Sequence, residues 1–178
     1  MSELKQKLLQ TKVKIGVTMF NDNNDPFAGV DEANAKGGRN PYLLDGQYLL
    51  QVERIDVIRS REKKTLFLIE MKILTSTNPD RPEGLLVSWM TNLDKDMGPI
   101  SCKRALAAIS GIDPNSDAAN EEITSDVCRL AVSEEQPFKG AQVFAQAMTV
   151  QTKAKTDFLD VKWIPVTTDA SGSVVVPS

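Results

Sequence analysis

Five segments with the residue pattern of β-strands define this chain, and a helical segment separates the third from the fourth. Apolar and polar side chains alternate along most of these segments, which is typical of strands that bury one face. The strand segments are residues 46–58, 65–74, 85–91, 141–151 and 158–166. A five-stranded Greek-key barrel with a helix between its third and fourth strands is the OB-fold. The sequence therefore predicts a mainly β protein built on a five-stranded OB barrel.

The first strand segment contains a change of phase. Apolar residues occupy even positions as far as Val52 and odd positions from Ile55 onward. One extra residue in a strand moves every following side chain to the opposite face. We therefore expect a β-bulge near residues 53–54.

The helical segment has recognisable ends. Pro99 suits the first turn of a helix, and Gly111 followed by Pro114 marks its end. Between them, apolar residues recur at helical spacing, namely Cys102, Ala105, Leu106 and Ile109. A second helical segment is expected at residues 119–131, inside an acidic insertion that spans residues 113–137.

We expect three parts along the chain. Residues 1–41 are rich in Asn, Asp and Gly and hold little apolar surface to bury, which predicts a partly extended N-terminal arm. Residues 42–166 form the OB domain together with its acidic helical insertion. Residues 167–178 are rich in Ser, Thr, Val and Gly and predict a flexible C-terminal tail.

The net charge of −3 comes from one segment. Residues 113–137 contain seven acidic residues and one basic residue, so the rest of the chain carries a net charge of +3. Basic residues concentrate in the connections between the first and second strands and between the fourth and fifth. In an OB-fold, these two loops and the face of the second and third strands bind the ligand. Single-stranded nucleic acid matches such a surface, because cations follow its backbone while aromatic rings stack on its bases.

The candidate nucleic-acid-binding residues follow from this placement. They are Arg54, Arg59, Arg61, Lys63, Lys64, Lys72, Trp89, Lys153, Lys155, Phe158 and Lys162. For stacking on bases we consider Trp89, Phe158, Tyr48 and Tyr42. The alternation of its strand equally fits a core position for Trp89, and a basic run equally fits a solvated hairpin tip, so both alternatives stay open.

The composition argues against catalysis. The chain has no histidine, which excludes Ser-His-Asp and Cys-His relays. Its two cysteines, Cys102 and Cys128, are too few for a four-cysteine zinc site and are expected in the core. Asp94 and Asp96 lack the further ligands of a calcium loop and fit a turn or a helix cap better than a Mg²⁺ site. We therefore expect a binding protein and no enzyme, with no cofactor and no metal.

Targeting signals are missing from the sequence. No stretch approaches 18 consecutive apolar residues, and the first ten residues lack the apolar core of a signal peptide. We expect a cytoplasmic protein without a membrane partner.

Several segments also resemble a known family. Residues 40–55, residues 66–73, the stretch ending at Gly111-Ile112 and residues 158–163 are similar to phage-encoded OB-fold single-stranded DNA-binding proteins. In that family a Gly-x-Tyr opens the first strand, and a helix ending in Gly-Ile or Gly-Val precedes an acidic spacer. The resemblance implies binding of single strands with little sequence preference during phage replication or recombination, in the cytoplasm of the host cell. Many of these proteins recruit replication or recombination partners through an acidic C-terminal tail, and the neutral residues 171–178 depart from that pattern.

A second function class fits the same features. A polar arm and an apolar tail are also typical of a phage structural or assembly subunit that reaches over its neighbour. In a single-stranded DNA-binding protein, the same arm is expected to support self-association as a dimer or as a cooperative array along the strand. Binding to labelled oligonucleotides at several salt concentrations separates these two classes, because counterion release makes DNA affinity fall with salt.

Overall fold

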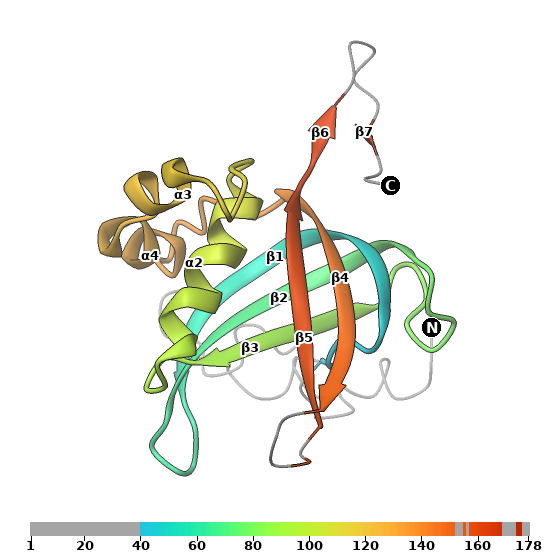
Figure 1. Cartoon of the computed structure of the whole chain (residues 1–178), viewed down its shortest axis with the longest axis horizontal. Coiled ribbons are helices and arrows are strands. Elements are labelled where there is room, and N and C mark those ends of the chain that lie inside the picture. The colour runs from blue at the N-terminus through green and yellow to red at the C-terminus, as the bar shows by residue number, and fades with distance from the viewer. Residues whose placement is uncertain (1–39, 152–154, 156, 169–173, 176–178) are drawn as a thin grey trace, which may run out of the picture. The chain divides into compact units, whose positions relative to one another are not determined.

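One antiparallel sheet with the strand order β3-β2-β1-β4-β5 forms the centre of the structure (Figure 1). This computed structural model describes residues 40–151, 155, 157–168 and 174–175. The strands are β1 (Gly46–Arg59), β2 (Thr65–Ser76), β3 (Leu86–Asn92), β4 (Gln142–Gln151) and β5 (Asp157–Pro165). The prediction of a mainly β protein with five strands at these places is confirmed. Within the described residues, β3 and β5 are the two edges of the sheet and no ladder joins them.

Most of the expected N-terminal arm lies outside the described residues, as does the candidate residue Lys153. The residues that lead into β1 run along the edge of β3. The N–H of Ser88 donates to the carbonyl of Pro41 at 2.9 Å, and Asn40 Nδ2 donates to Glu70 Oε1 at 3.1 Å. Residues 41–42 therefore bridge to Ser88 of the edge strand β3, while the Asn40 side chain reaches Glu70 on β2.

The strand β1 is bulged and shared between two neighbours. Residues 46–51 pair with β4, and residues from Tyr48 to Arg59 pair with β2. The register with β2 shifts between Val52 and Arg54, which confirms the predicted bulge, and it shifts once more between Leu49 and Leu50. Val52 and Ile55 are both buried. The bulge thus keeps apolar side chains on the inner face on both sides of the change of phase.

Beyond residue 51, the second edge of β1 bonds to Gln136 of the acidic insertion and to residues 140–141 instead of to a strand. Gln136 Nε2 donates to the carbonyl of Ile55 at 2.9 Å, and Gln136 Oε1 accepts from the N–H of Ile55 at 2.8 Å. The N–H of Val52 donates to the carbonyl of Ala141, and the carbonyl of Val52 accepts from the N–H of Gly140, both at 2.8 Å. One side-chain amide therefore replaces a strand partner at this position of the edge.

Replacing Gln136 by alanine is expected to lower the free energy of unfolding by about 2 kcal/mol, because the N–H and the carbonyl of the buried Ile55 both lose their partners. Urea unfolding followed by circular dichroism measures the difference. The neighbouring exposed Glu135 provides the control, since Glu135→Ala should change the free energy by no more than about 0.5 kcal/mol. Equal losses for the two variants would contradict the bridging role of Gln136.

The helix α2 (Met97–Ile109) packs on the sheet through its apolar stripe and contacts β3, β4 and β5. Its buried residues include the four predicted for the core face, Cys102, Ala105, Leu106 and Ile109. The polar face of α2 points away from this core, and it carries Ser101 and Arg104. The prediction of a core-packed helix between the third and fourth strands is confirmed.

The acidic insertion differs from its prediction. The single helical segment expected at residues 119–131 is two short helices, α3 (Asp117–Glu122) and α4 (Ser125–Ala131). Ile123 leaves the helical conformation with ψ 83°, and the Thr124 side chain accepts from the N–H of Val127 as the N-cap of α4. A threonine at this point favours a new helix start over a continuous helix, because its hydroxyl competes for backbone N–H groups.

The two cysteines meet between α2 and α4. Cys102 is buried in the core and Cys128 is half-buried. A hydrogen bond from the Cys102 thiol lowers the pKa of Cys128, and the nearby charge of Lys103 acts in the same direction. The same contact and burial raise the pKa of Cys102. Cys128 is therefore the more acidic thiol of the pair.

Alkylation of Cys128 by iodoacetamide is expected to reach half of its maximal rate at a lower pH than that of an ordinary cysteine, because the thiolate is the reactive form and the pKa of Cys128 is lowered. An ordinary cysteine reaches this point at about pH 8.5. Mass spectrometry of the alkylated peptides measures the rate at each pH. Replacing Cys102 by alanine removes the hydrogen-bond donor and should move the midpoint of Cys128 upward. An unchanged midpoint would rule out the thiol pair.

The chain continues past β5 into a separate two-residue ladder. The strand β6 (Thr167–Thr168) pairs in antiparallel fashion with β7 (Val174–Val175).

Among the described helices, none has both the length and the apolar character needed to cross a membrane.

Candidate nucleic-acid interface

A groove of about 260 Å³ lies between β3 and β5 beside the start of α2, and we call it the β3–β5 groove. Trp89 from β3 and Phe158 and Trp163 from β5 line it. The rings of Trp89 and Trp163 meet edge to face, with centroids 5.2 Å apart and an interplanar angle of 83°. Trp163 is only 5% exposed, whereas Phe158 is 50% exposed. The exposed ring of Phe158 and the half-buried ring of Trp89 thus line the same groove, and aromatic faces of this kind stack on bases.

The polar face of α2 and the turn before it supply cations to this groove. Lys95 and Arg104 both line it and both are exposed. Their position depends on Gly98, because a Cβ at this residue would lie 1.9 Å from the carbonyl oxygen of Asn92. Glycine therefore allows α2 to start against the end of β3, which aligns the helix with the groove. One carboxylate, Asp160, also lines the groove.

The β1–β2 hairpin is anchored next to the same groove. Its tip carries Arg59, Arg61, Lys63 and Lys64, and all four are exposed. The N–H of Thr65 donates to Asp94 Oδ2 at 2.8 Å, and the N–H of Leu93 donates to the carbonyl of Thr65 at 2.9 Å. Asp94 thus holds a turn, as the sequence favoured. Because Asn92 and Lys95 of this turn line the groove, the base of the hairpin adjoins the groove.

The cations of the hairpin are not equivalent. Lys64 pairs with Glu62, and this hydrogen bond together with the charge of Lys64 lowers the pKa of Glu62. Within the described residues, Arg59, Arg61 and Lys63 have no ion-pair partner. Their charge is therefore the more available for an external anion.

Two predicted residues lie apart from the groove. Arg54 pairs with Asp56 at 2.7 Å on β1, so a neighbouring carboxylate already balances its charge. Lys72 is exposed on β2 opposite Leu86 and does not line the groove. The structure does not bring either cation together with Trp89 and Phe158.

The tyrosines separate into one core residue and one rim residue. Tyr48 is 1% exposed and its hydroxyl donates to the carbonyl of Leu44 at 2.8 Å, so its expected stacking role is wrong. Burial raises the pKa of this phenol. Tyr42 is 46% exposed, and its hydroxyl lies 3.7 Å from Met90 Sδ, which belongs to a residue that lines the groove. Tyr42 therefore extends the aromatic surface along β3.

The connection between β4 and β5 is described only in part. Lys155 is exposed and has a φ of 57°, a conformation that non-glycine residues adopt mainly in turns. Phe158 follows directly after the start of β5 and pairs with Val150 of β4. Figure 1 shows the β1–β2 hairpin and the paired ends of β4 and β5 at the same end of the sheet.

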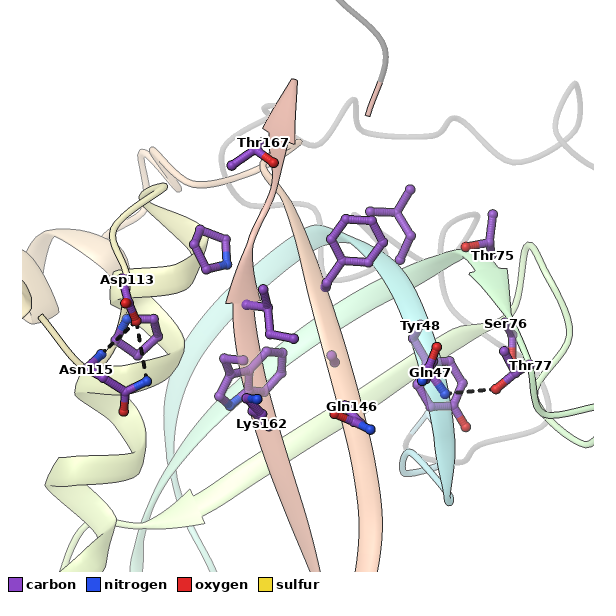
Figure 2. A pocket seen from close by; sticks show the side chains of 17 residues that line it. Gln47, Tyr48, Thr75, Ser76, Thr77, Asp113, Asn115, Gln146, Lys162 and Thr167 are labelled. Carbon is purple, nitrogen blue, oxygen red and sulfur yellow. Dashed lines mark hydrogen bonds between the residues drawn. The ribbon is translucent and has the colours of Figure 1, made fainter. Parts of the chain in front are cut away.

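The last predicted residue, Lys162, lies in a different hollow. A trough of about 680 Å³ extends over β1, β4 and β5 and is bordered by residues 113–115; we call it the β1–β4–β5 trough (Figure 2). Lys162 is exposed within it and stands beside Gln146 on the neighbouring strand. Because Lys162 follows Phe158 by an even number of residues, both side chains leave the same face of β5.

Sequence reasoning missed Lys95 and Arg104. Arg104 follows Ser101 by three residues on the face of α2 opposite the apolar stripe, so the helical pattern marks it as solvent-facing. That pattern does not tell which solvent-facing residues lie next to β5. Their role depends on the distance between α2 and two strands that are remote in sequence.

Comparison with known proteins does not narrow the interpretation of this site. No family model and no curated protein sequence matches the chain.

Proposed function

We propose that this protein binds single-stranded DNA with little sequence preference, through the β3–β5 groove and the adjoining β1–β2 hairpin. The observation that carries the proposal is one groove lined by the exposed Phe158, by Trp89, which is half-buried and packs against the core, and by the exposed cations Lys95 and Arg104. Bases stack on Trp89 and Phe158, while Arg104, Lys95 and the hairpin tip neutralise phosphates. Every base has a flat apolar face, so stacking of this kind tolerates any sequence.

The arrangement of the strands supports an OB barrel as the scaffold of this site. The spatial order of β4, β1, β2 and β3 is that of a Greek key, and α2 comes between β3 and β4 in the chain. The third and fifth strands of an OB barrel are its partly open seam. Trp89 and Trp163 bridge the gap between β3 and β5 with their side chains. On this proposal the groove is the seam of the barrel.

The acidic insertion has a complementary part in the proposal. Its residues Glu121, Glu122 and Asp126 are exposed on α3 and α4, and like charge repels phosphate from that surface. This repulsion directs the single-stranded DNA toward the basic β1–β2 hairpin. The protein coats and protects single strands during replication or recombination, which for a phage protein takes place in the host cell.

Replacing Phe158 by alanine tests the stacking part of the proposal. The affinity for labelled oligo(dT) should fall about tenfold to a hundredfold, since one stacked base contributes about 1–3 kcal/mol. Fluorescence anisotropy measures the affinity, and the salt dependence should stay the same because no charge is removed. Phe158 is half exposed, so the fold should tolerate the change.

Two further variants sharpen this test. Phe158→Trp keeps an aromatic face and should retain the affinity. Leu130→Ala removes an equally exposed apolar side chain from α4, away from the groove, and should have no effect. If Phe158→Ala binds as tightly as Leu130→Ala, bases do not stack on this ring.

A further inference from the structure

The floor and wall of the β1–β4–β5 trough are two rows of side chains that cross three strands. Leu49, Phe144 and Ile164 pair across β1, β4 and β5 and form an apolar row. Gln47, Gln146 and Lys162 pair across the same strands and form a polar row next to it. Strand geometry places neighbouring rows on one face about 7 Å apart. Phe144, in the middle of the apolar row, is 7% exposed, and Leu49 and Ile164 on either side of it are half-buried. The trough therefore offers an apolar floor with two amides and one cation along its side.

This combination corresponds to the parts of a nucleotide. A base presents an apolar face and a polar edge, and side-chain amides of Gln and Asn bond to such edges. The ammonium group of Lys162 is a point charge for a phosphate. The volume of about 680 Å³ lies in the range of pockets that hold small ligands.

The remaining charge of the trough is directed toward its own loop. Asp113 Oδ1 accepts from the backbone N–H of Asn115 at 3.0 Å and from Asn115 Nδ2 at 3.3 Å (Figure 2). These two bonds hold the backbone and the side chain of Asn115 at the border of the trough. Lys162, on β5, lies between this loop and Gln146 of β4 in Figure 2.

The trough adjoins the β3–β5 groove across β5. Trp163 lines both hollows, Asp160 lines the groove, and Lys162 lines the trough two residues further along the same face. The distance along β5 from Phe158 to Lys162 is about 13 Å at the usual rise per residue. Single-stranded DNA that leaves the groove at Phe158 needs only this short path to reach Lys162.

We propose that the β1–β4–β5 trough binds a nucleotide, with the base on the Leu49–Phe144–Ile164 row and its phosphate at Lys162. This inference rests on the proposed function where the nucleotide is a further unit of the bound DNA strand. A free mononucleotide offers the same chemistry, so the experiment includes both sources.

The test compares a short with a long oligonucleotide. Anisotropy is measured for labelled oligo(dT) of about four nucleotides, the smallest site of one OB domain, and of about twenty nucleotides, which exceeds the largest. Lys162→Glu should weaken binding of the long strand about tenfold, reduce its salt slope by about 0.7, and leave the short strand unchanged. Gln146→Ala should weaken the long strand alone, without a change in salt slope. Both residues are exposed, so the fold should persist, and circular dichroism checks this.

A matched control uses Lys139→Glu, which reverses an exposed charge that lines neither hollow. Equal effects of Lys162→Glu and Lys139→Glu on the long strand would overturn the inference, as would equal effects of Lys162→Glu on both oligonucleotide lengths. A separate titration with dTMP, followed by calorimetry, covers the free nucleotide. Failure of the proposed function is recognised separately, since the wild-type protein would then bind neither oligonucleotide. In that case the trough proposal stands only if dTMP binds and Lys162→Glu abolishes this binding.

Discussion

Reversing the charge of Arg59 and Arg61 together is expected to lower the affinity for single-stranded DNA about a hundredfold, the sum of two charge-assisted contacts of about 1.4 kcal/mol each. These two residues stand at the exposed tip of the β1–β2 hairpin, and neither has an ion-pair partner among the described residues. Each contact between a cation and a phosphate of a single strand contributes about −0.7 to the slope of log affinity against log salt. The double variant Arg59→Glu, Arg61→Glu should therefore show a slope shallower by about 1.4. Anisotropy titrations at several salt concentrations provide both quantities.

The acidic insertion provides the matched control for this result. Glu121→Lys together with Glu122→Lys reverses two exposed charges on α3 and should leave the affinity unchanged or raise it. A global electrostatic effect would make affinity follow net charge alone, so that the hairpin and insertion variants change it by equal and opposite amounts. If the hairpin variant loses more affinity than the insertion variant gains, the phosphates of the DNA bind at the hairpin. Equal losses in both variants would contradict the placement of the interface.

Replacing Gly98 by alanine is expected to destabilise the protein by about 3 kcal/mol, although alanine is the better helix former by about 1 kcal/mol. The new Cβ would lie 1.9 Å from the carbonyl oxygen of Asn92 and 2.9 Å from the Cα of Leu93. Both are backbone atoms, so the start of α2 has to move away from the end of β3. Urea unfolding measures the loss of stability.

The displacement of α2 should also reach the groove. Met97, Ser101 and Arg104 of α2 line it, so the Gly98→Ala variant should bind oligo(dT) more weakly even where it remains folded. Ser101→Ala, at a half-buried position of the same helix, should cost no more than about 0.5 kcal/mol of stability. A Gly98→Ala protein as stable as the wild type would show that the close approach of α2 to β3 is not required.

The strands can be predicted from the sequence because their signal is local. Alternation with period two locates β1 to β5, and the change of phase between Val52 and Ile55 locates the bulge from the residue pattern alone. The start of α4 at Thr124 escapes the same reasoning, because the apolar stripe of residues 119–131 continues across the break. A threonine that caps a new helix is also a local signal, but the spacing of apolar residues alone does not detect it.

The candidate site can be predicted only in part, because it depends on contacts between remote elements. Residue type and place on the strands indicate Trp89 and Phe158, and both line the groove. Tyr48 has the same residue type and the same kind of place, yet the inward face of β1 buries it. The sequence states which residues share a face, but the packing of other elements decides whether that face is covered.

The cations follow the same rule. Charge clustering indicates Arg59 and Arg61, whereas Arg104 depends on the approach of α2 to β5. Lys162 is predicted beside the other cations and instead lies in the separate trough. Lys162 shares a face of β5 with Phe158, and the residues that surround each of them on other elements decide which hollow it lines.

The most direct test of the central claim is an anisotropy titration of labelled oligo(dT) with the full chain over a range of salt concentrations. The account predicts submicromolar binding at low salt and a log-log slope of about −2 or steeper, which corresponds to about three or more neutralised phosphates. Absent binding, or binding that does not change with salt, together with large homogeneous assemblies of the protein, would contradict the account and favour a structural subunit.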